Sequence, residues 1–255
     1  MAKSKIVWII GGGSGIGAAV ARLMAQRGWI VAISGRRVER LAEVAEGQKT
    51  IHPYRLDVTD QPAIEATIAE IVAAHGRIDL AIFGAATWQP MALGDYDFEK
   101  FHKVVDTNLL GAVRLASPLI RQFEAQGGGE FAVIASVAGY FGLPRSAAYG
   151  STKAALIQFC QTMRTELAPR NIGVRLIAPG FVKSELTAKN DFPMPFLLET
   201  DDAARRIVDG LTGSRRFEIA FPRRLVWPMK LMRMLPYPLF FWLAAKTMPK
   251  AGPPR

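Results

Sequence analysis

Residues 6–17 read IVWIIGGGSGIG and decide the fold of this 255-residue chain. Five apolar residues suit a buried strand, the glycines after them suit a tight turn, and a helical pattern then continues to residue 27. The N–H groups at such a helix start, together with the positive end of the helix dipole, can hold a pyrophosphate. An ordinary flexible turn is the alternative. The position between a first strand and a first helix favours a dinucleotide site.

Outward from this stretch, short apolar runs alternate with helical patterns. We predict strands at 6–10, 29–34, 51–56, 80–83, 131–135, 173–177 and 217–221. Further helices are predicted at about 38–46, 62–75, 98–126, 147–168 and 201–211. This alternation indicates an α/β fold: a single Rossmann-type, doubly wound parallel sheet with helices on both faces. Since no linker or repeat interrupts it, we predict one cofactor-binding catalytic domain at 1–222 and a C-terminal extension at 223–255.

The composition excludes several classes of protein. Half of the residues are hydrophobic and 21% are charged, which is typical of a globular chain and not of a disordered one. Cys160 is the only cysteine and only three histidines are present, so an internal disulfide is excluded and no metal site is expected. The first apolar run is short and ends in glycines, so we expect no export signal and a cytoplasmic location.

The end of the second predicted strand bears on the choice of dinucleotide. NAD sites usually place a carboxylate there for the ribose 2′-hydroxyl, whereas residues 34–37 read SGRR. Arg36 and Arg37 suit a 2′-phosphate, which accepts bidentate, charge-assisted hydrogen bonds, and they favour NADP over NAD. The alternative is that both arginines merely begin a solvated helix. Asp57 and Val58 follow the third strand, where Asp57 either meets the adenine or caps the next helix.

A tyrosine and a lysine stand four residues apart in a predicted helix, so Tyr149 and Lys153 project from one face. An ammonium about 6 Å from a phenol, at an effective dielectric of roughly 20, favours the phenolate by about 3 kcal/mol. This predicts a lowered pKa for Tyr149 and proton exchange with an alcohol or carbonyl. Ser136 ends the fifth strand, where its hydroxyl can hydrogen-bond the substrate oxygen. Asn108 is either a surface amide or marks a helix distortion that holds a water for proton relay.

These motifs resemble, in order and spacing, the short-chain dehydrogenase/reductase family over about residues 5–185. The resemblance implies that Tyr149 is the acid/base and that Lys153 holds the nicotinamide ribose and tunes Tyr149. It also implies that Ser136 orients the carbonyl, that Asn108 completes the tetrad and that Val182 binds the nicotinamide amide through its backbone. Further cofactor contacts are implied for three segments of the chain: Gly11, Gly13, Ser14, Gly15, Ile16, Gly17, Gly84, Ala85, Pro179, Gly180, Val182 and Ser184.

The chain departs from the family pattern at two places. Ile10 stands where the family usually has threonine before the first glycine. Residues 83–86, Phe-Gly-Ala-Ala, replace the usual Asn-Asn-Ala-Gly after the fourth strand. Because that segment contacts the cofactor mostly through its backbone, binding is expected to survive. The loss of the asparagines bears on sheet stability and ribose positioning.

Aromatic side chains are expected to form the substrate pocket. We assign its wall to Trp88, Tyr140, Phe141, Phe181 and the segment 185–198. The resemblance implies a mobile lid, which we place at about 185–212 and which contains FPMPFLL at 192–198. The pocket is therefore expected to be apolar. Ordinary core packing is the alternative for aromatic residues of this kind.

The C-terminal extension holds most of the net charge. Residues 215–255 contain nine basic residues and one acid, a net charge of +8 against +10 for the whole chain. The longest run there without a charge, 234–245, contains two prolines and is too short to span a bilayer. Interleaved apolar and basic residues predict an anchor on a membrane surface. The alternative is an arm packed across the pocket or a neighbouring subunit. No basic recognition helix is visible, so nucleic acid is not an expected partner.

Together the motifs predict an NADP(H)-dependent oxidoreductase. It reduces an aldehyde or ketone, or oxidises the matching alcohol, on an apolar small-molecule substrate. The alternative is a catalytically weak cofactor-binding protein of the same fold, with a regulatory role or a scaffold role at a membrane surface. The intact Ser136, Tyr149 and Lys153 argue against that alternative. The resemblance implies a homodimer or homotetramer.

Overall fold

The computed structural model describes residues 4–91, 96–190 and 192–247. Its centre is a seven-stranded parallel sheet of order β3-β2-β1-β4-β5-β6-β7. The strands are β1 (Ile6–Ile10), β2 (Ile30–Gly35), β3 (Ile51–Arg55), β4 (Leu80–Phe83), β5 (Gly129–Ile134), β6 (Ile172–Pro179) and β7 (Glu218–Phe221). The order reverses between β1 and β4, which makes the carboxyl edge of these strands the expected ligand crevice. The predicted doubly wound parallel sheet is confirmed.

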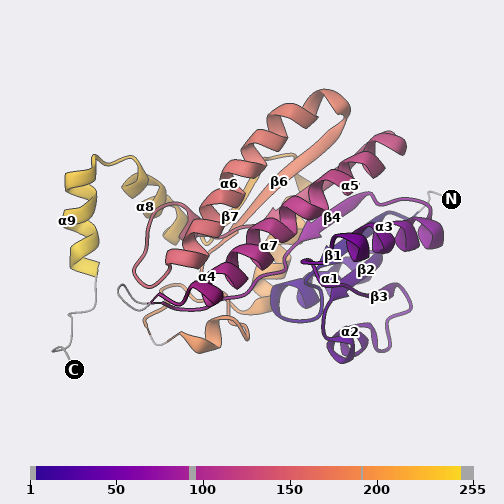
Figure 1. The fold of residues 1–255 in the computed structure, drawn as a ribbon, viewed down its shortest axis with the longest axis horizontal. Coiled ribbons are helices and arrows are strands. Elements are labelled where there is room, and N and C mark those ends of the chain that lie inside the picture. The colour runs from indigo at the N-terminus through magenta and orange to yellow at the C-terminus, as the bar shows by residue number, and fades with distance from the viewer. Residues whose placement is uncertain (1–3, 92–95, 191, 248–255) are drawn as a thin grey trace.

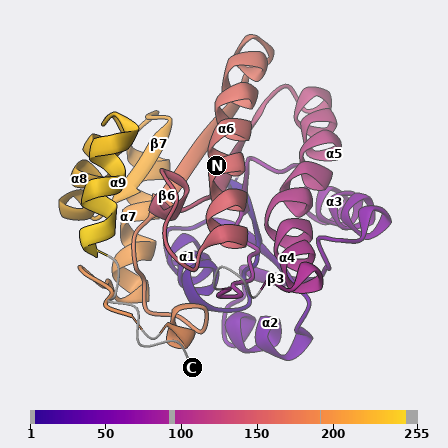
Figure 2. The same cartoon turned by 60° about the vertical axis from the view of Figure 1, so that its left-hand side comes forward.

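Helices cover both faces of the sheet (Figure 1, Figure 2). The helices are α1 (Gly15–Gln26), α2 (Val38–Ala45), α3 (Gln61–His75), α4 (Phe98–Val105), α5 (Gly111–Ala125), α6 (Ala147–Leu167), α7 (Thr200–Gly213), α8 (Arg223–Arg233) and α9 (Tyr237–Thr247). One hydrophobic core lies between the sheet and α1, α2 and α7, and a second lies between the sheet and α3, α5, α6 and α8. Burial on both faces explains why β1 is apolar at every position.

The helix predicted at 98–126 is interrupted. A π-helical turn at Asp106–Leu110 separates α4 from α5, and Asn108 lies inside it, with no exposed surface. The distortion considered at Asn108 is therefore present, and the surface-amide alternative is wrong. A π-turn inserts one extra residue and often occurs at functional sites.

The C-terminal extension forms two helices, α8 and α9, where the sequence showed only a proline-broken segment. Pro228 lies inside α8, and Pro236 and Pro238 lie at the start of α9. Val226 and Met229 of α8 are buried in the core beside α6, so this helix packs on the domain. Within the described ranges, the structure contains no helix long and apolar enough to cross a membrane.

Candidate active site

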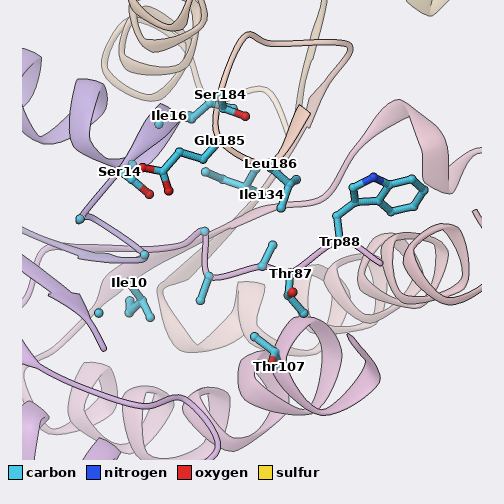
Figure 3. A pocket seen from close by; sticks show the side chains of 18 of the residues that line it. Ile10, Ser14, Ile16, Thr87, Trp88, Thr107, Ile134, Ser184, Glu185 and Leu186 are labelled. Carbon is cyan, nitrogen blue, oxygen red and sulfur yellow. The ribbon is translucent and has the colours of Figure 1, made fainter. Parts of the chain in front are cut away.

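A cavity of about 480 Å³ opens at the carboxyl ends of β1, β2, β4, β5 and β6. It is lined by all of the cofactor contacts expected from the sequence and by three of the four catalytic residues: Gly11, Gly13, Ser14, Gly15, Ile16, Gly17, Arg36, Arg37, Asp57, Val58, Gly84, Ala85, Ser136, Tyr149, Lys153, Pro179, Gly180, Val182 and Ser184. In Figure 3 the cavity runs from Ser14 and Glu185 at one end to Trp88 at the other. Its dimensions suit an extended small molecule.

The glycine turn forms the end of the cavity at which Ser14 and Glu185 lie. Gly11 has φ +90° and donates its N–H to Ser34 O at 2.7 Å. A Cβ on Gly17 would lie 2.1 Å from the carbonyl oxygen of Gly11, so only glycine lets α1 approach β1 this closely. Ser14 is the N-cap residue of α1, yet its hydroxyl accepts a hydrogen bond from Arg37 Nη2 at 3.1 Å instead of capping the helix. The amino end of α1 therefore faces the cavity beside a guanidinium group.

A cluster of arginines borders the same end. Arg37 Nη1 lies 3.0 Å from Glu185 Oε2, and Arg40 Nη2 lies 3.4 Å from Glu185 Oε1. Glu185 belongs to the segment after β6, so the pairs join two sides of the cavity mouth. Arg40 also lines the cavity, although the sequence singled out only Arg36 and Arg37. Each of these side chains is about half exposed, so a ligand phosphate can reach them.

The structure excludes one of the two roles that the sequence left open for Asp57. It accepts hydrogen bonds from Thr59 N at 3.0 Å and Thr59 Oγ1 at 2.9 Å, while Asp60 caps α3. The helix-capping role for Asp57 is therefore wrong. Burial alone raises the pKa of its carboxyl, but the Thr59 hydrogen bonds and nearby Arg36 outweigh this and lower the pKa. A charged acceptor is thus held at the cavity wall beside Val58.

Tyr149, Lys153 and Ser136 meet at the floor of the cavity. Ser136 follows β5, and its Oγ accepts a hydrogen bond from Ala138 N at 3.1 Å. Lys153 Nζ donates to Ile134 O at 2.8 Å and lies 5.4 Å from the centre of the Tyr149 ring. The last residues of β5 therefore position both the hydroxyl and the ammonium group. Helix α6 supplies the phenol from one turn before the lysine.

The expected lowering of the Tyr149 pKa is wrong in this structure. Burial raises the pKa of Tyr149 to about 12, and a hydrogen bond with Ser136 only partly opposes this. Burial also lowers the pKa of Lys153 to about 7. An enclosed ammonium loses its hydration, which favours the neutral amine. Lys153 therefore stabilises the Tyr149 phenolate less than the sequence predicts. The phenol of Tyr149 therefore keeps its proton at neutral pH.

Asn108 does not line the cavity but supports its wall. Its Oδ1 accepts from Thr87 N at 2.7 Å, and its Nδ2 donates to Thr87 O at 2.9 Å. The same Nδ2 lies 3.4 Å from Thr152 Oγ1 on α6. A buried amide that satisfies a backbone N–H and C=O together fixes the segment after β4 against α6.

Comparison with known proteins identifies the family. The model of the short chain dehydrogenase family matches residues 5–193. The chain belongs to the short-chain dehydrogenase family. An uncharacterized oxidoreductase of Myxococcus xanthus is 35% identical over 236 residues, which cover 91% of this chain and 93% of that protein. The chain is therefore an oxidoreductase of a family that binds nicotinamide cofactors.

Two solved structures share the fold. A short-chain dehydrogenase from Streptomyces avermitilis is 24% identical and superposes with a TM-score of 0.82, covering 97% of this chain and 100% of that one. ElxO, solved with NADP bound, is 28% identical and superposes with a TM-score of 0.77, covering 85% of this chain and 97% of that one. The short-chain dehydrogenase fold thus spans nearly the whole described chain.

The two departures from the short-chain dehydrogenase pattern leave the sheet intact. Phe83 is fully buried in the core, and β4 pairs with both β1 and β5 along its length. Gly84 N donates to Ile10 O at 2.7 Å, which continues the pairing beyond the strand. Gly84 and Ala85 then pack against Gly11. A Cβ on Gly11 would lie 2.7 Å from Ala85 N. The segment lacks the family's asparagines and is held instead by the burial of Phe83 and by backbone pairing.

The predicted pocket wall is only partly correct. Trp88 lines the main cavity, with its ring centre 5.3 Å from that of Tyr149 in an edge-to-face arrangement. Tyr140 and Phe141 instead line a second cavity on the far side of α6, because the backbone turns sharply after Ser136. Phe181 packs on Phe192, with ring centres 6.1 Å apart.

The segment 185–212, for which a lid was predicted, is a loop only in its first half. Its second half is α7, whose inner face is buried in the core. The remaining loop is closed at its base by a β-bridge between Val182 and Leu198. Trp88 Nε1 donates to Asn190 Oδ1 at 3.0 Å and thereby ties the loop to the cavity wall. Asp191 lies outside the described residues.

Arg40, Thr87 and Thr107 also line the cavity and were not predicted from the sequence, whereas Glu185, Leu186 and Thr187 belong to the segment 185–198 that was assigned to the pocket wall. Thr187 Oγ1 donates to Val182 O at 2.7 Å and accepts from Ser184 N at 3.0 Å, so it organises the turn after β6. Arg40 lies in the first turn of α2, four residues after Arg36, and this short spacing was a usable signal. The positions of the others depend on contacts between distant segments.

Proposed function

We propose that this protein is an NADP(H)-dependent oxidoreductase that reduces an aldehyde or ketone or oxidises the matching alcohol. One observation carries the proposal: Tyr149, Ser136 and Lys153 meet on the floor of the same cavity whose mouth the glycine turn forms. A cofactor-binding protein without activity does not require a partly buried phenol beside a buried hydroxyl. The family relationship supports the same reaction class.

The residues present fit a dinucleotide. Glycines leave space where a Cβ would fill the turn, and the amino end of α1 faces that space. Asp57 and Val58 are proposed to meet the adenine, and Val182 the nicotinamide amide. Lys153 is proposed to hold the nicotinamide ribose. When bound, NADP(H) supplies the hydride donor or acceptor of the reaction.

The chain's own groups handle the proton. Tyr149 carries its proton at neutral pH because burial raises the pKa of the phenol to about 12. In carbonyl reduction its hydroxyl donates that proton to the developing alkoxide of the substrate, while Ser136 hydrogen-bonds the same oxygen. Trp88 packs against the Tyr149 ring and shields it from water. Asn108 is proposed to be a positioning residue that fixes the segment around Thr87.

An apolar substrate is supported by the surroundings of the catalytic end. Trp88 and Leu186 line the cavity there. The loop above carries Phe192 and Met194, which are partly buried. Screening aliphatic and aromatic aldehydes and ketones for oxidation of NADPH, followed by absorbance, tests the proposal. Failure of every carbonyl and every alcohol tested, with cofactor binding retained, would support the scaffold alternative.

A preference for NADP(H) follows from the arginine cluster. We expect NADPH to bind at least tenfold more tightly than NADH, which corresponds to about 1.4 kcal/mol. The double substitution Arg36→Gln and Arg37→Gln is expected to remove most of that preference, because it removes donors to the 2′-phosphate. Fluorescence titration of both reduced cofactors measures the ratio. A matched double substitution of exposed cations outside the cavity, Arg22→Gln and Lys49→Gln, should leave it unchanged. Equal affinities in the unaltered protein would contradict the prediction.

Glu185 is expected to compete with the 2′-phosphate for the same guanidinium groups. The carboxylate pairs with Arg37 and Arg40 at half-exposed positions, where an ion pair contributes about 0.2–1 kcal/mol. Glu185→Gln is therefore expected to tighten NADPH binding by about two- to fivefold and to leave NADH binding unchanged. Glu199→Gln, which removes a carboxylate paired with Lys183 outside the cavity, is the control. Weaker NADPH binding in Glu185→Gln would show that the carboxylate supports the site.

A further inference from the structure

The two C-terminal helices form a separate surface at one end of the molecule. Figure 1 and Figure 2 show α8 and α9 at the opposite end of the molecule from α3, and α8 packs next to β7 while α9 lies farther out in Figure 1. These helices belong to none of the contacts assigned above to the cofactor or to proton transfer. Their two faces differ sharply in burial, and the difference defines the surface.

The inner face is fastened to the domain. Val226 and Met229 are buried in the core. Lys230 pairs with Glu218 of β7, and the other oxygen of that carboxylate accepts from Tyr140 Oη at 2.7 Å. Phe240 of α9 is buried, with its ring centre 5.2 Å from that of Phe141. The helices are therefore held in a fixed orientation relative to the domain.

The outer face is apolar and exposed. Trp227 and Leu231 of α8 are 69% and 63% exposed, and Met234, the C-cap residue of α8, is 80% exposed; their spacing places them on one side of the helix. On α9, Tyr237 is 76% exposed and Phe241 61%, and their rings stack at 5.8 Å. We call these five residues the outer apolar face. Large exposed apolar patches mark contact with a partner or a membrane.

Positive charge flanks the outer apolar face at the start of α8. Arg223 and Arg224 are exposed there, while Arg233 is exposed beside the second cavity. In the sequence, residues 219–255 contain seven basic residues and no acid. Glu218, immediately before this segment, is engaged by Lys230 and Tyr140. A partner for this surface must therefore offer apolar contact and negative charge together.

We propose that the outer apolar face docks on an anionic lipid bilayer, with its aromatic side chains among the headgroups and its arginines on the lipid phosphates. Tryptophan and tyrosine favour the membrane–water interface, and basic residues favour anionic lipid. Each helix has eleven residues, which is too short to span the hydrocarbon core, so the helices lie along the surface. A second copy of this chain fits less well, because a twofold contact would bring the arginines of both copies together.

Flotation with lipid vesicles tests the proposal on the full-length protein. We expect it to float with phosphatidylcholine vesicles that contain phosphatidylglycerol, to float much less with phosphatidylcholine alone, and to be released by high salt. The double substitution Trp227→Ser and Phe241→Ser is expected to reduce flotation at least fivefold. Phe98→Ser, at a 73% exposed aromatic on α4, is the matched control and should float like the unaltered protein.

A second pair of variants tests the electrostatic contribution of the arginines to vesicle binding. Arg224→Glu is expected to reduce flotation, and Arg22→Glu, the same change at an exposed position of α1, should leave it unchanged. Absence of flotation at low salt, or equal flotation by all variants, would overturn the proposal. So would ultracentrifugation showing a dimer that Trp227→Ser and Phe241→Ser convert to a monomer without any binding to vesicles. NADPH binding measured in parallel keeps this result separate from the proposed oxidoreductase activity.

Discussion

Replacement of Tyr149 by phenylalanine is expected to lower kcat by about 10³-fold or more, since general acid catalysis typically contributes about 10²–10⁴-fold. The substitution removes the only atom of Tyr149 that can donate a proton. It keeps the ring, and therefore the edge-to-face packing on Trp88 at 5.3 Å. We expect the dissociation constant for NADPH to change by less than about threefold. Steady-state kinetics on a substrate from the carbonyl screen, together with NADPH titration, measures both quantities.

Tyr140→Phe is the matched control for this prediction. Tyr140 is a buried tyrosine whose pKa is also raised by burial, but its hydroxyl donates to Glu218 on the other side of α6. Loss of that hydrogen bond should cost stability and leave kcat nearly unchanged. Near-normal kcat in Tyr149→Phe would show that another group donates the proton. A loss of turnover in Tyr140→Phe equal to that in Tyr149→Phe would show that the effect comes from packing.

The parts of the site that depend on local sequence were predictable. The apolar run, the glycines and the helix of residues 6–17 are contiguous, so their geometry follows from local propensity and close packing. Tyr149 and Lys153 share one helix face for the same reason. Ser136 joins them because parallel strands end at one edge of the sheet. These features require no knowledge of side chains elsewhere.

The features that were missed depend on contacts between distant segments. The ion pairs of Glu185 with Arg37 and Arg40 join segments about 145 residues apart in the sequence. Neither segment contains a local pattern that predicts these pairs. The pKa of Tyr149 was predicted in the wrong direction because the burial of both groups outweighs the effect of the Lys153 charge. Burial is a property of the completed fold. Helices α8 and α9 were missed because prolines usually end helices, whereas here they lie near helix starts or on an exposed side.

Replacement of Gly17 by alanine is expected to abolish measurable cofactor binding and to destabilise the domain. The added Cβ would lie 2.1 Å from the carbonyl oxygen of Gly11 and 2.9 Å from its carbonyl carbon. Neither atom is the end of a flexible side chain, so α1 must move away from β1. Forced overpacking of this kind typically costs about 1–3 kcal/mol. The movement also shifts the N–H groups at the start of α1 away from the position where a pyrophosphate is proposed to bind. Thermal unfolding and NADPH titration measure the two effects.

Gly13→Ala tests whether the damage in Gly17→Ala comes from the close contact between α1 and β1 or from the presence of any side chain in the glycine turn. Gly13 lies in the same turn and lines the same cavity, but its added Cβ would meet Leu41 Cδ2 at 3.4 Å and the Cβ of Arg40 at 3.5 Å. These are ordinary contacts, and the first is with a flexible side chain. We expect NADPH affinity within about fivefold of the unaltered protein and little change in melting temperature. Equal damage from both alanines would show that the turn resists any side chain. Retained binding in Gly17→Ala would mean that the dinucleotide does not rely on the close contact between α1 and β1.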